Sequence, residues 1–179
     1  MLRPPETFLT ARLAARRATV ADAPAVLAAY ANDETVTRYL SWKAHADVKP
    51  VEEFLGHAEE AWRTGKGAMP WLLHLRDTSE LAGSIGVSLG TGSAMFGYVL
   101  AKKHWHRGLM AEALSSLVEW SLAQPSIYRA WAFCDVENPA SVRVMEKAGM
   151  QREGVLRRWH VCPTIGSEPR DCTVCARVK

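Results

Sequence analysis

Three short apolar segments separated by turns of three residues constrain the fold more than any other feature of the chain. The segments cover residues 69–76, 80–89 and 93–101, and the turns are Asp77–Thr78–Ser79 and Gly90–Thr91–Gly92. Short strands joined by tight turns pair as antiparallel neighbours. We therefore expect an antiparallel meander over residues 69–101.

The residues before the meander predict one strand and two helices. Residues 8–17 are expected to form the strand, and Thr19 or Asp22 can cap the first helix. The face of that helix is expected to comprise Ala25, Val26, Ala29 and Tyr30. The apolar face of the second helix is expected to comprise Val51, Phe54, Leu55, Ala58 and Trp62. Gly65 and Gly67 are expected to end this helix.

After the meander, helices alternate with strands. One helical face carries Met110, Ala113, Leu114, Leu117, Val118 and Ser121 and ends before Pro125. An apolar strand over 127–136 follows, then a helix that Asn138–Pro139 opens and Gly149 stops, and then strands at about 151–161 and 168–178. Because a helical crossover makes its two strands parallel neighbours, we expect a mixed sheet. The chain is thus assigned to the α/β (α+β) class, as a single domain over 1–179 with about four flanking helices.

Composition narrows the function classes. The 179 residues are 48% hydrophobic and 23% charged, with a formal net charge of +3, which is typical of a globular protein and gives no reason to expect nucleic-acid binding. No apolar stretch approaches the ~18 residues of a membrane helix, and Glu6 and two prolines stand where a signal peptide would be apolar. We expect a cytoplasmic protein with four cysteines kept as thiols. The oligomeric state is left open, with a homodimer as one alternative.

The segment HWHRGLMAEAL, residues 104–114, is the first candidate site. It joins the end of a strand to the start of a helix, where Gly108 permits a close backbone approach and the first-turn amides lack helical partners. Those amides, the positive end of the helix and Arg107 suit a pyrophosphate. The alternative is that Gly108 only makes a turn.

A second segment favours the pyrophosphate interpretation. FGYVLAKKHWHRGLMAEAL, followed by DVENPASVRVMEKAGMQREGVLRR, resembles the acetyl-coenzyme A-binding half of the GNAT superfamily, and most of all its RimJ/RimL-like N-acetyltransferases. The run from Asn138 to Met150 is specific when it lies downstream of such a loop. The resemblance implies a GNAT fold, with a mixed central sheet, antiparallel N-terminal strands and a parallel pair splayed at the cofactor site.

The resemblance also implies which residues bind acetyl-coenzyme A. The family pattern Q/R-x-x-G-x-G/A falls on Trp105, Gly108 and Met110, so two of its three positions differ. Backbone amides do not depend on side chains, and the pyrophosphate is expected on His106, Arg107, Gly108, Leu109, Met110 and Ala111. The pantetheine is expected along Tyr98, Val99 and Leu100 and near Asn138 and Ser141, with a strand amide near Val99 as the oxyanion donor.

Acetyl transfer to an amine needs a base and a proton for the leaving thiolate. His160 is our candidate base because histidine titrates in the useful range; its alternative role is that of a surface residue on a strand. His74, Glu137 and Glu112 are weaker candidates, and Glu112 alternatively stabilises a helix N-terminus. Many GNAT enzymes have a general-acid tyrosine where this chain has Met145, so Ser141 is the candidate acid, or else a small packing residue.

Several other patterns receive less weight. His160, Cys162, Cys172 and Cys175 imitate a zinc site, but the last two thiols lie in an expected strand. Cys134 is interpreted as a buried residue that, beside a coenzyme thiol, forms a mixed disulfide on oxidation. The basic stretch at 102–107 is better explained by a cofactor than by RNA.

The resemblance predicts an acetyl-coenzyme A-dependent N-acetyltransferase that works by direct attack of a primary amine. The favoured acceptor is a protein or peptide N-terminus of the ribosomal-protein type, in a cleft that Trp42 and Trp159 help to line. The alternatives are a small amine or antibiotic as acceptor, and a non-catalytic acyl-coenzyme A-binding module.

Overall fold

A computed structural model describes residues 2–179 and contains one eight-stranded sheet in the order β1-β2-β3-β4-β5-β6-β8-β7. The strands are β1 Thr7–Leu9, β2 Leu13–Arg17, β3 Ala68–Leu75, β4 Leu81–Gly90, β5 Ser93–Leu100, β6 Arg129–Asp135, β7 Gln151–Val161 and β8 Pro169–Val178. The α-helices are α1 Ala23–Val26, α2 Glu34–Thr37, α3 Lys49–Thr64, α4 Leu109–Ala123 and α5 Pro139–Lys147. Short helical turns cover Val20–Asp22 (η1), Leu27–Ala31 (η2) and Lys102–His104 (η3).

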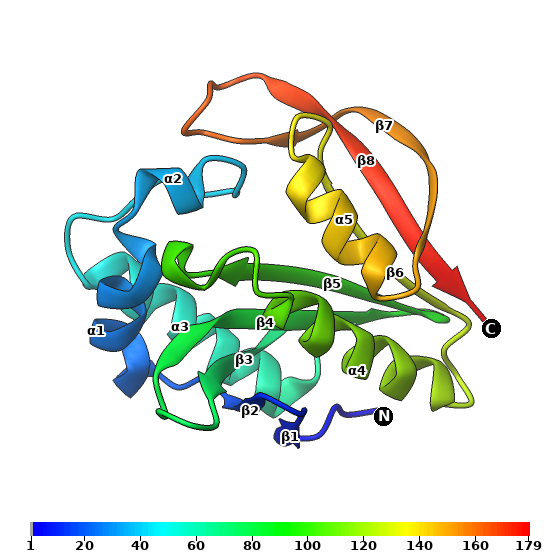
Figure 1. Ribbon diagram of the computed structural model, residues 1–179, viewed down its shortest axis with the longest axis horizontal. Coiled ribbons are helices and arrows are strands. Elements are labelled where there is room, and N and C mark those ends of the chain that lie inside the picture. Colours follow the sequence, from blue (N-terminus) through cyan, green and yellow to red (C-terminus); the bar gives the residue numbers. More distant parts are fainter. Residues whose placement is uncertain (1) are drawn as a thin grey trace.

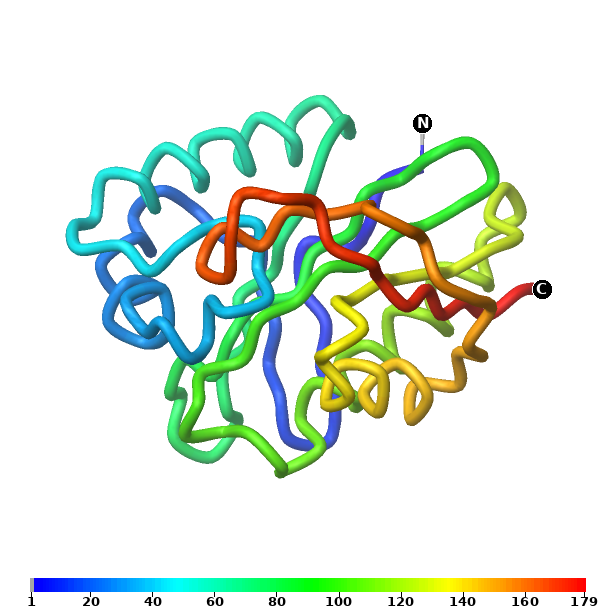
Figure 2. Tube along the Cα trace, turned by 90° about the horizontal axis from the view of Figure 1, so that it is seen from above, coloured from blue at the N-terminus to red at the C-terminus, as the bar shows by residue number. Residues whose placement is uncertain are grey.

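The helices cover the sheet on both faces. Helix α3 lies on one face, while α4 and α5 lie on the other (Figures 1 and 2). The expected face of α4 is confirmed, since Met110, Ala113, Leu114, Leu117, Val118 and Ser121 are all buried. These side chains pack against those of β3, β4 and β5 that point to the same face. None of the helices in residues 2–179 has the length and hydrophobicity needed to cross a bilayer.

The predicted meander is confirmed, but the N-terminal strand is not continuous. Strands β3, β4 and β5 pair antiparallel in sequence. Residues 8–17, expected as one strand, form β1 and β2 with a turn between them, and the two pair with each other. The turn at residues 10–12 is held by contacts to α4, about a hundred positions away, which local sequence does not reveal.

Two expected helical faces need correction. In the first helical segment the buried residues are Ala23, Val26, Tyr30 and Ala31, while Ala25 is exposed and Ala29 is half-buried. The expected face fails because α1 passes into a π-helical turn over Leu27–Ala31, which changes the facing of the chain. In α3 the face is as expected except for Phe54, which lies on the flank and is 52% exposed. Gly65 caps α3 in the left-handed conformation with φ 73°. The short helix α2 was not predicted.

Strands β5 and β6 form the parallel pair and then separate. They pair only over Ser93–Met95 and Arg129–Trp131. Beyond those residues β5 remains paired with β4 as far as Leu100, and β6 with β8 as far as Asp135. No strand among the described residues therefore pairs with the β6-facing edge of β5 after Met95. The splayed parallel pair is confirmed.

The last two strands form a long hairpin beyond β6. Strand β8 is antiparallel to both β6 and β7 and lies between them. The crossover through α5 therefore makes β6 and β7 parallel but not neighbours, contrary to a simple β-α-β expectation. Figure 1 shows the β7–β8 loop extending toward α2, and the Thr164 hydroxyl lies 3.5 Å from the Thr37 carbonyl oxygen.

Candidate active site

The loop before α4 has the backbone shape of an anion-binding site. His106 and Gly108 both adopt left-handed conformations, with φ of 61° and 74°. Alternation of this kind turns successive N–H groups toward one side, and such concavities bind anions. Helix α4 begins at Leu109, where its first-turn amides and positive end add to the same site. The loop therefore fits the pyrophosphate that the sequence assigned to it.

The two departures from the family pattern have a structural explanation. The Trp105 indole donates a hydrogen bond of 2.7 Å to the Leu100 carbonyl oxygen, and its ring packs on the hydrophobic cluster that includes Tyr30 and Ala101. The Met110 side chain is 4% exposed and lies in the main core. The Met110 side chain is buried and that of Trp105 is partly buried against the protein, so the larger residues leave the amides of the loop available.

Glu112 and Arg12 connect the loop before α4 to the turn between β1 and β2. The Arg12 guanidinium is 2.7 Å from Glu112 Oε2, and the Thr10 hydroxyl and the Arg12 amide donate to Oε1 at 2.5 and 2.8 Å. Burial by itself would raise the pKa of Glu112, but these hydrogen bonds outweigh it and lower the pKa. Arg12 also donates to the Arg107 carbonyl oxygen at 2.8 Å. Glu112 is thus held as a carboxylate that anchors the β1–β2 turn to the loop, which favours its structural role over that of a base.

His104 lies beneath the loop and contacts its arginine. The His104 side chain is 4% exposed, and its Nδ1 is 3.1 Å from Arg107 Nη1. Because a guanidinium only donates, Nδ1 accepts, and the ring proton is placed on Nε2. That atom is 3.6 Å from Glu80 Oε2, beyond hydrogen-bond distance. Burial lowers the pKa of His104; Glu80 opposes this shift, whereas Lys103 and Arg107 add to it.

The gap between β5 and β6 brings two predicted site residues together. Tyr98 on β5 reaches across the gap to α5, where its hydroxyl lies 2.7 Å from Ser141 Oγ and 3.2 Å from the Ser141 carbonyl oxygen. Asn138 caps α5 by accepting from the Ser141 amide at 3.2 Å. The sequence named Tyr98 only for its strand position, so the role of its hydroxyl is new information from the structure.

The groups around this gap are neutral. Burial raises the pKa of Tyr98, although the hydrogen bond with Ser141 opposes the shift. Burial also raises the pKa of Cys134 to about 11, again against a hydrogen bond from Ser141. Met145 is wholly buried in the core, as a side chain without a proton to give. The gap therefore presents hydroxyl and thiol donors and no anionic nucleophile.

His160 lies on the other face of β6. Its ring is 5.2 Å from the Phe133 ring, and Trp159 is 6.1 Å from the same ring. Side chains alternate along a strand, so Phe133 and Cys134 point to opposite faces. His160 and Ser141 are therefore on opposite sides of the splay rather than in contact. Burial lowers the pKa of His160, and Asp135 opposes the shift, so the ring is neutral at neutral pH.

The carboxylates near His160 are paired. The Asp135 side chain is fully buried and bonds to Arg170 Nε and, at 3.1 Å, to Nη2. Burial alone would raise the pKa of Asp135, but the hydrogen bonds from Arg170 and from the Glu137 amide outweigh it and lower the pKa. Arg170 also lies 2.9 Å from Glu137 Oε2. Glu137 is thus part of an ion-pair network rather than a free loop charge.

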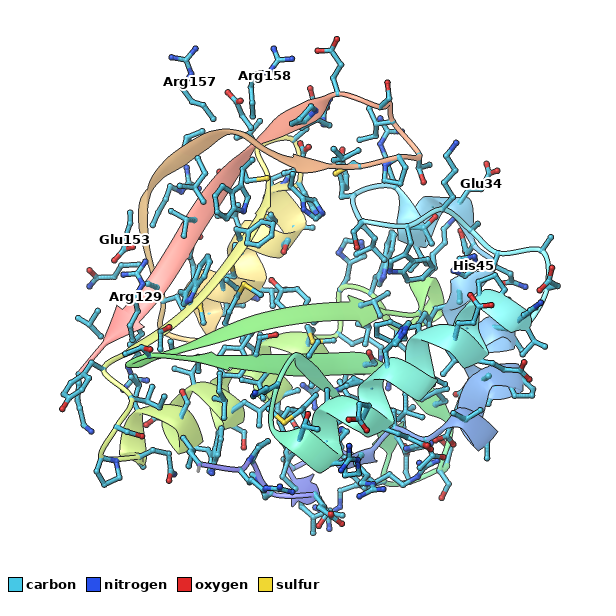
Figure 3. The ribbon with its side chains drawn as sticks, turned by 180° about the vertical axis from the view of Figure 1, so that it is seen from behind. Glu34, His45, Arg129, Glu153, Arg157 and Arg158 are labelled. Atoms are coloured by element: carbon cyan, nitrogen blue, oxygen red, sulfur yellow. The ribbon has the colours of Figure 1, made fainter. Side chains whose placement is uncertain are left out.

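His74 lies away from the splay, and the other candidates are placed as follows. His74 is on β3, which β4 separates from β5. Trp42 stacks on His45 with ring centroids 5.2 Å apart. Figure 3 shows His45 and Glu34 on the α2 side, with Arg157 and Arg158 at the outer bend of β7. All four cysteines are buried free thiols, and the described residues contain no cluster of three or more His, Cys, Asp or Glu able to hold a metal ion.

Comparison with known proteins identifies the family. The model of the acetyltransferase (GNAT) domain matches residues 12–151. The chain belongs to the GNAT acetyltransferases. It is 32% identical over 153 residues to the uncharacterized N-acetyltransferase YoaA of Bacillus subtilis (strain 168), covering 84% of this chain and 85% of that protein.

Solved structures of this GNAT fold include proteins with bound coenzyme. RimL, a ribosomal L7/L12 α-N-protein acetyltransferase in complex with coenzyme A, matches with a TM-score of 0.84 and 19% identity over 97% of this chain and 98% of its own. The microcin C7 self-immunity acetyltransferase MccE, in complex with acetyl-coenzyme A and AMP, matches with a TM-score of 0.86 and 16% identity, covering 98% of each chain.

The expected family, fold, enzyme class and cofactor are thereby confirmed. This GNAT protein is an N-acetyltransferase that uses acetyl-coenzyme A and an amine acceptor. The sequence missed three elements of the site: the Tyr98 hydroxyl, Arg12 and His104. Arg12 is separated from its partner Glu112 by a hundred positions, so no local pattern could have revealed it.

Proposed function

We propose that this GNAT enzyme acetylates the N-terminal α-amine of a protein or peptide, of the ribosomal-protein type, in the cytoplasm. The observation that carries this proposal is the weakness of the available bases. Asp135 and Glu137 are paired with Arg170, and Glu112 with Arg12. His160 is the neutral group left on that face of the splay.

A weak base suits an α-amine better than a lysine. With a pKa near 7.8, about 14% of an α-amine is neutral at pH 7, against about 0.04% of a lysine amine with a pKa near 10.4. Deprotonating a lysine would require a strong, free carboxylate or a strongly desolvated site. His160 is sufficient for the α-amine, directly or through one water.

Structural relatives agree with this acceptor class. RimL acts on the ribosomal protein L7/L12, and two further matches are named a putative ribosomal-protein-serine acetyltransferase from Vibrio cholerae and a ribosomal-protein-S5-alanine acetyltransferase from Vibrio fischeri. MccE has the same fold and is named for self-immunity to microcin C7, so the fold alone does not fix the acceptor.

The site residues support a direct transfer. The amides from His106 to Ala111 bind the pyrophosphate of the coenzyme. The free edge of β5 at Tyr98, Val99 and Leu100 aligns its pantetheine arm. The bound coenzyme supplies the acetyl thioester. His160 accepts the proton that the amine loses. A main-chain amide near Val99 stabilises the oxyanion, and Ser141 donates to the leaving sulfur. Cys134 stays protonated because its pKa is about 11, so a covalent acetyl-enzyme is not expected.

A matched set of peptides tests the acceptor. One peptide has a free N-terminus and no lysine, the second has a blocked N-terminus and one lysine, and a small primary amine is the third acceptor. We expect thiol release from acetyl-coenzyme A only with the first. Transfer to the lysine peptide alone or to the small amine alone would refute the α-amine proposal. Coenzyme binding without any acceptor-dependent release would favour the non-catalytic module.

His160→Gln tests the base. We expect kcat to fall ~100-fold, the lower end of the contribution of a positioned base, with coenzyme affinity unchanged. His57→Gln is the control, because His57 is an exposed residue of α3. An unchanged kcat in His160→Gln would remove His160 from the mechanism.

A further inference from the structure

The contact between Tyr98 and Ser141 joins the two sides of the splay. Tyr98 belongs to β5 and Ser141 to the first turn of α5, and their hydroxyl oxygens are 2.7 Å apart. Around them the two strands have already separated, so backbone pairing does not impose this contact. It lies where the resemblance places the thioester, and Met145 cannot provide a proton there.

The direction of this hydrogen bond decides where the serine proton points. Tyr98 has one hydroxyl hydrogen and two nearby acceptors, Ser141 Oγ at 2.7 Å and the Ser141 carbonyl oxygen at 3.2 Å. If Ser141 donated to Tyr98, the serine proton would be used within the pair. If Tyr98 donates to Ser141 Oγ, the serine proton is free for another acceptor. The phenol donates in either case, and its nearer acceptor is Ser141 Oγ, at 2.7 Å against 3.2 Å for the carbonyl oxygen, which favours the second arrangement.

A sulfur atom lies at the same turn of α5. The Cys134 thiol donates to the Asn138 carbonyl oxygen at 3.7 Å, and Ser141 opposes part of the rise in the pKa of Cys134 that burial causes. Because the Tyr98 hydroxyl donates to Ser141 Oγ, the hydrogen of the Ser141 hydroxyl is available for a sulfur acceptor. A leaving thiolate is a stronger acceptor of that hydrogen than a neutral thiol.

We infer that Tyr98 is a positioning residue that donates to Ser141 Oγ and thereby presents the Ser141 proton to the leaving sulfur. This inference rests on the proposed acetyl transfer. As the C–S bond breaks, its electron pair goes to sulfur, and sulfur takes the Ser141 proton. Ser141 recovers a proton from water, while the proton that the acceptor nitrogen loses returns to solvent through His160. One proton therefore moves, in net terms, from nitrogen to sulfur.

The experiment compares Tyr98→Phe, Ser141→Ala and the double variant, with Tyr128→Phe as control because Tyr128 is 62% exposed on the surface. The measurements are the single-turnover rate with preloaded acetyl-coenzyme A, the solvent deuterium isotope effect on that rate, and coenzyme A affinity by calorimetry. We expect Tyr98→Phe to slow the rate ~10-fold, as for the loss of one hydrogen bond, and Ser141→Ala to slow it ~100-fold. Coenzyme affinity should change less than ~2-fold, since the pyrophosphate loop is untouched.

The double variant is decisive. If Tyr98 acts only through Ser141, the double variant is no slower than Ser141→Ala, and both Tyr98→Phe and Ser141→Ala reduce the isotope effect. Additive losses, or a Tyr98→Phe enzyme with the wild-type isotope effect, would show a merely structural tyrosine and overturn the inference. If the wild-type protein transfers acetyl to no amine, the proposed function itself fails. A wild-type enzyme that transfers acetyl, with an unaffected Tyr98→Phe variant, rejects only the role of Tyr98.

Discussion

Gly108 provides the sharpest test of the cofactor loop. Its φ of 74° lies in the left-handed region, and a Cβ built there would meet only Arg12 Nη2, at 3.7 Å, an ordinary contact. Gly108→Ala therefore has room, and its cost is conformational. That cost is about 1–2 kcal/mol for a residue with a Cβ, and it approaches 3 kcal/mol for the β-branched Gly108→Val.

The conformational cost of the substitution can lower either the free energy of unfolding or the affinity for the coenzyme. If the loop keeps its shape in the variant, the whole cost lowers the free energy of unfolding. If the empty loop relaxes into another shape, the binding-competent conformation becomes rare, and the coenzyme Kd rises by the same free energy. Since about 1.4 kcal/mol is tenfold, full relaxation would raise Kd about 5- to 30-fold for Gly108→Ala and up to ~150-fold for Gly108→Val.

The assay combines calorimetric titration of coenzyme A with thermal unfolding. Gly92→Ala is the matched control: its φ is 71°, its Cβ would lie 3.5 Å from Tyr128, and it precedes β5 at the end opposite the loop. We expect Gly92→Ala to lose stability without losing affinity, and the Gly108 variants to lose affinity in the order Ala, then Val. Wild-type affinity in Gly108→Val together with a wild-type Tm would refute the assignment of the loop to the pyrophosphate, because the loop would then have relaxed without any effect on binding.

Three further outcomes follow from buried groups. The pKa of His104 is lower in the folded protein, so just below pH 6.5 the unfolded chain binds more protons than the folded one. The contribution of neutral His104 to stability is therefore complete above pH 6.5 and is lost as the pH falls. His104→Gln should flatten the fall of Tm between pH 7 and 5, and equal slopes in the variant and the wild type would contradict this. Arg170→Leu should cost about 3 kcal/mol in urea unfolding, because it leaves the fully buried Asp135 without its partner, whereas Arg63→Leu, at an exposed pair, should cost little. Cys134, with its pKa raised to about 11, should react with iodoacetamide ~100-fold more slowly than an ordinary thiol; peptide mass spectrometry measures this, and fast labelling would show that the thiol is not buried in solution.

Oxidation gives Cys134 a second test. The Cys134 thiol lies 3.7 Å from the carbonyl oxygen of Asn138, at the turn of α5 where the coenzyme thiol is proposed to lie. Slow formation of a mixed disulfide with coenzyme A, absent in Cys134→Ser, would support that placement.

The fold was predictable where the local pattern and the tertiary environment agree. The faces of α4 and the strands of the meander are such cases, because each apolar period had one buried solution. The break between β1 and β2 was not predictable, since Thr10 and Arg12 turn the chain by bonding to Glu112. Phe54 fitted the period of α3 but is 52% exposed, because how far the buried face of a helix extends is set by its tertiary contacts and not by its period.

In the candidate site, too, local features could be predicted from the sequence and long-range contacts could not. The loop at Gly108 was recognisable because backbone conformation is encoded locally by glycine. The Tyr98–Ser141 contact spans 43 positions and depends on how far β5 and β6 diverge, which no spacing in the sequence specifies. Trp105 and Met110 depart from the pattern of the family, and both side chains are turned into the protein rather than toward the proposed pyrophosphate site.

The alternation of β6 gives the site two chemically distinct sides. Phe133, with His160 beside it, faces one way, and Cys134, with Ser141 beside it, faces the other. With His160 as the proposed base on one side and Ser141 as the proposed proton donor on the other, the two cannot both act on one bound molecule that stays on its own side of the sheet. They can act together only when the amine and the thioester meet in the gap between β5 and β6. The proposed arrangement thus favours a ternary complex over a sequential exchange through the enzyme, and the pKa of Cys134, raised to about 11, keeps that thiol from acting as a nucleophile in such an exchange.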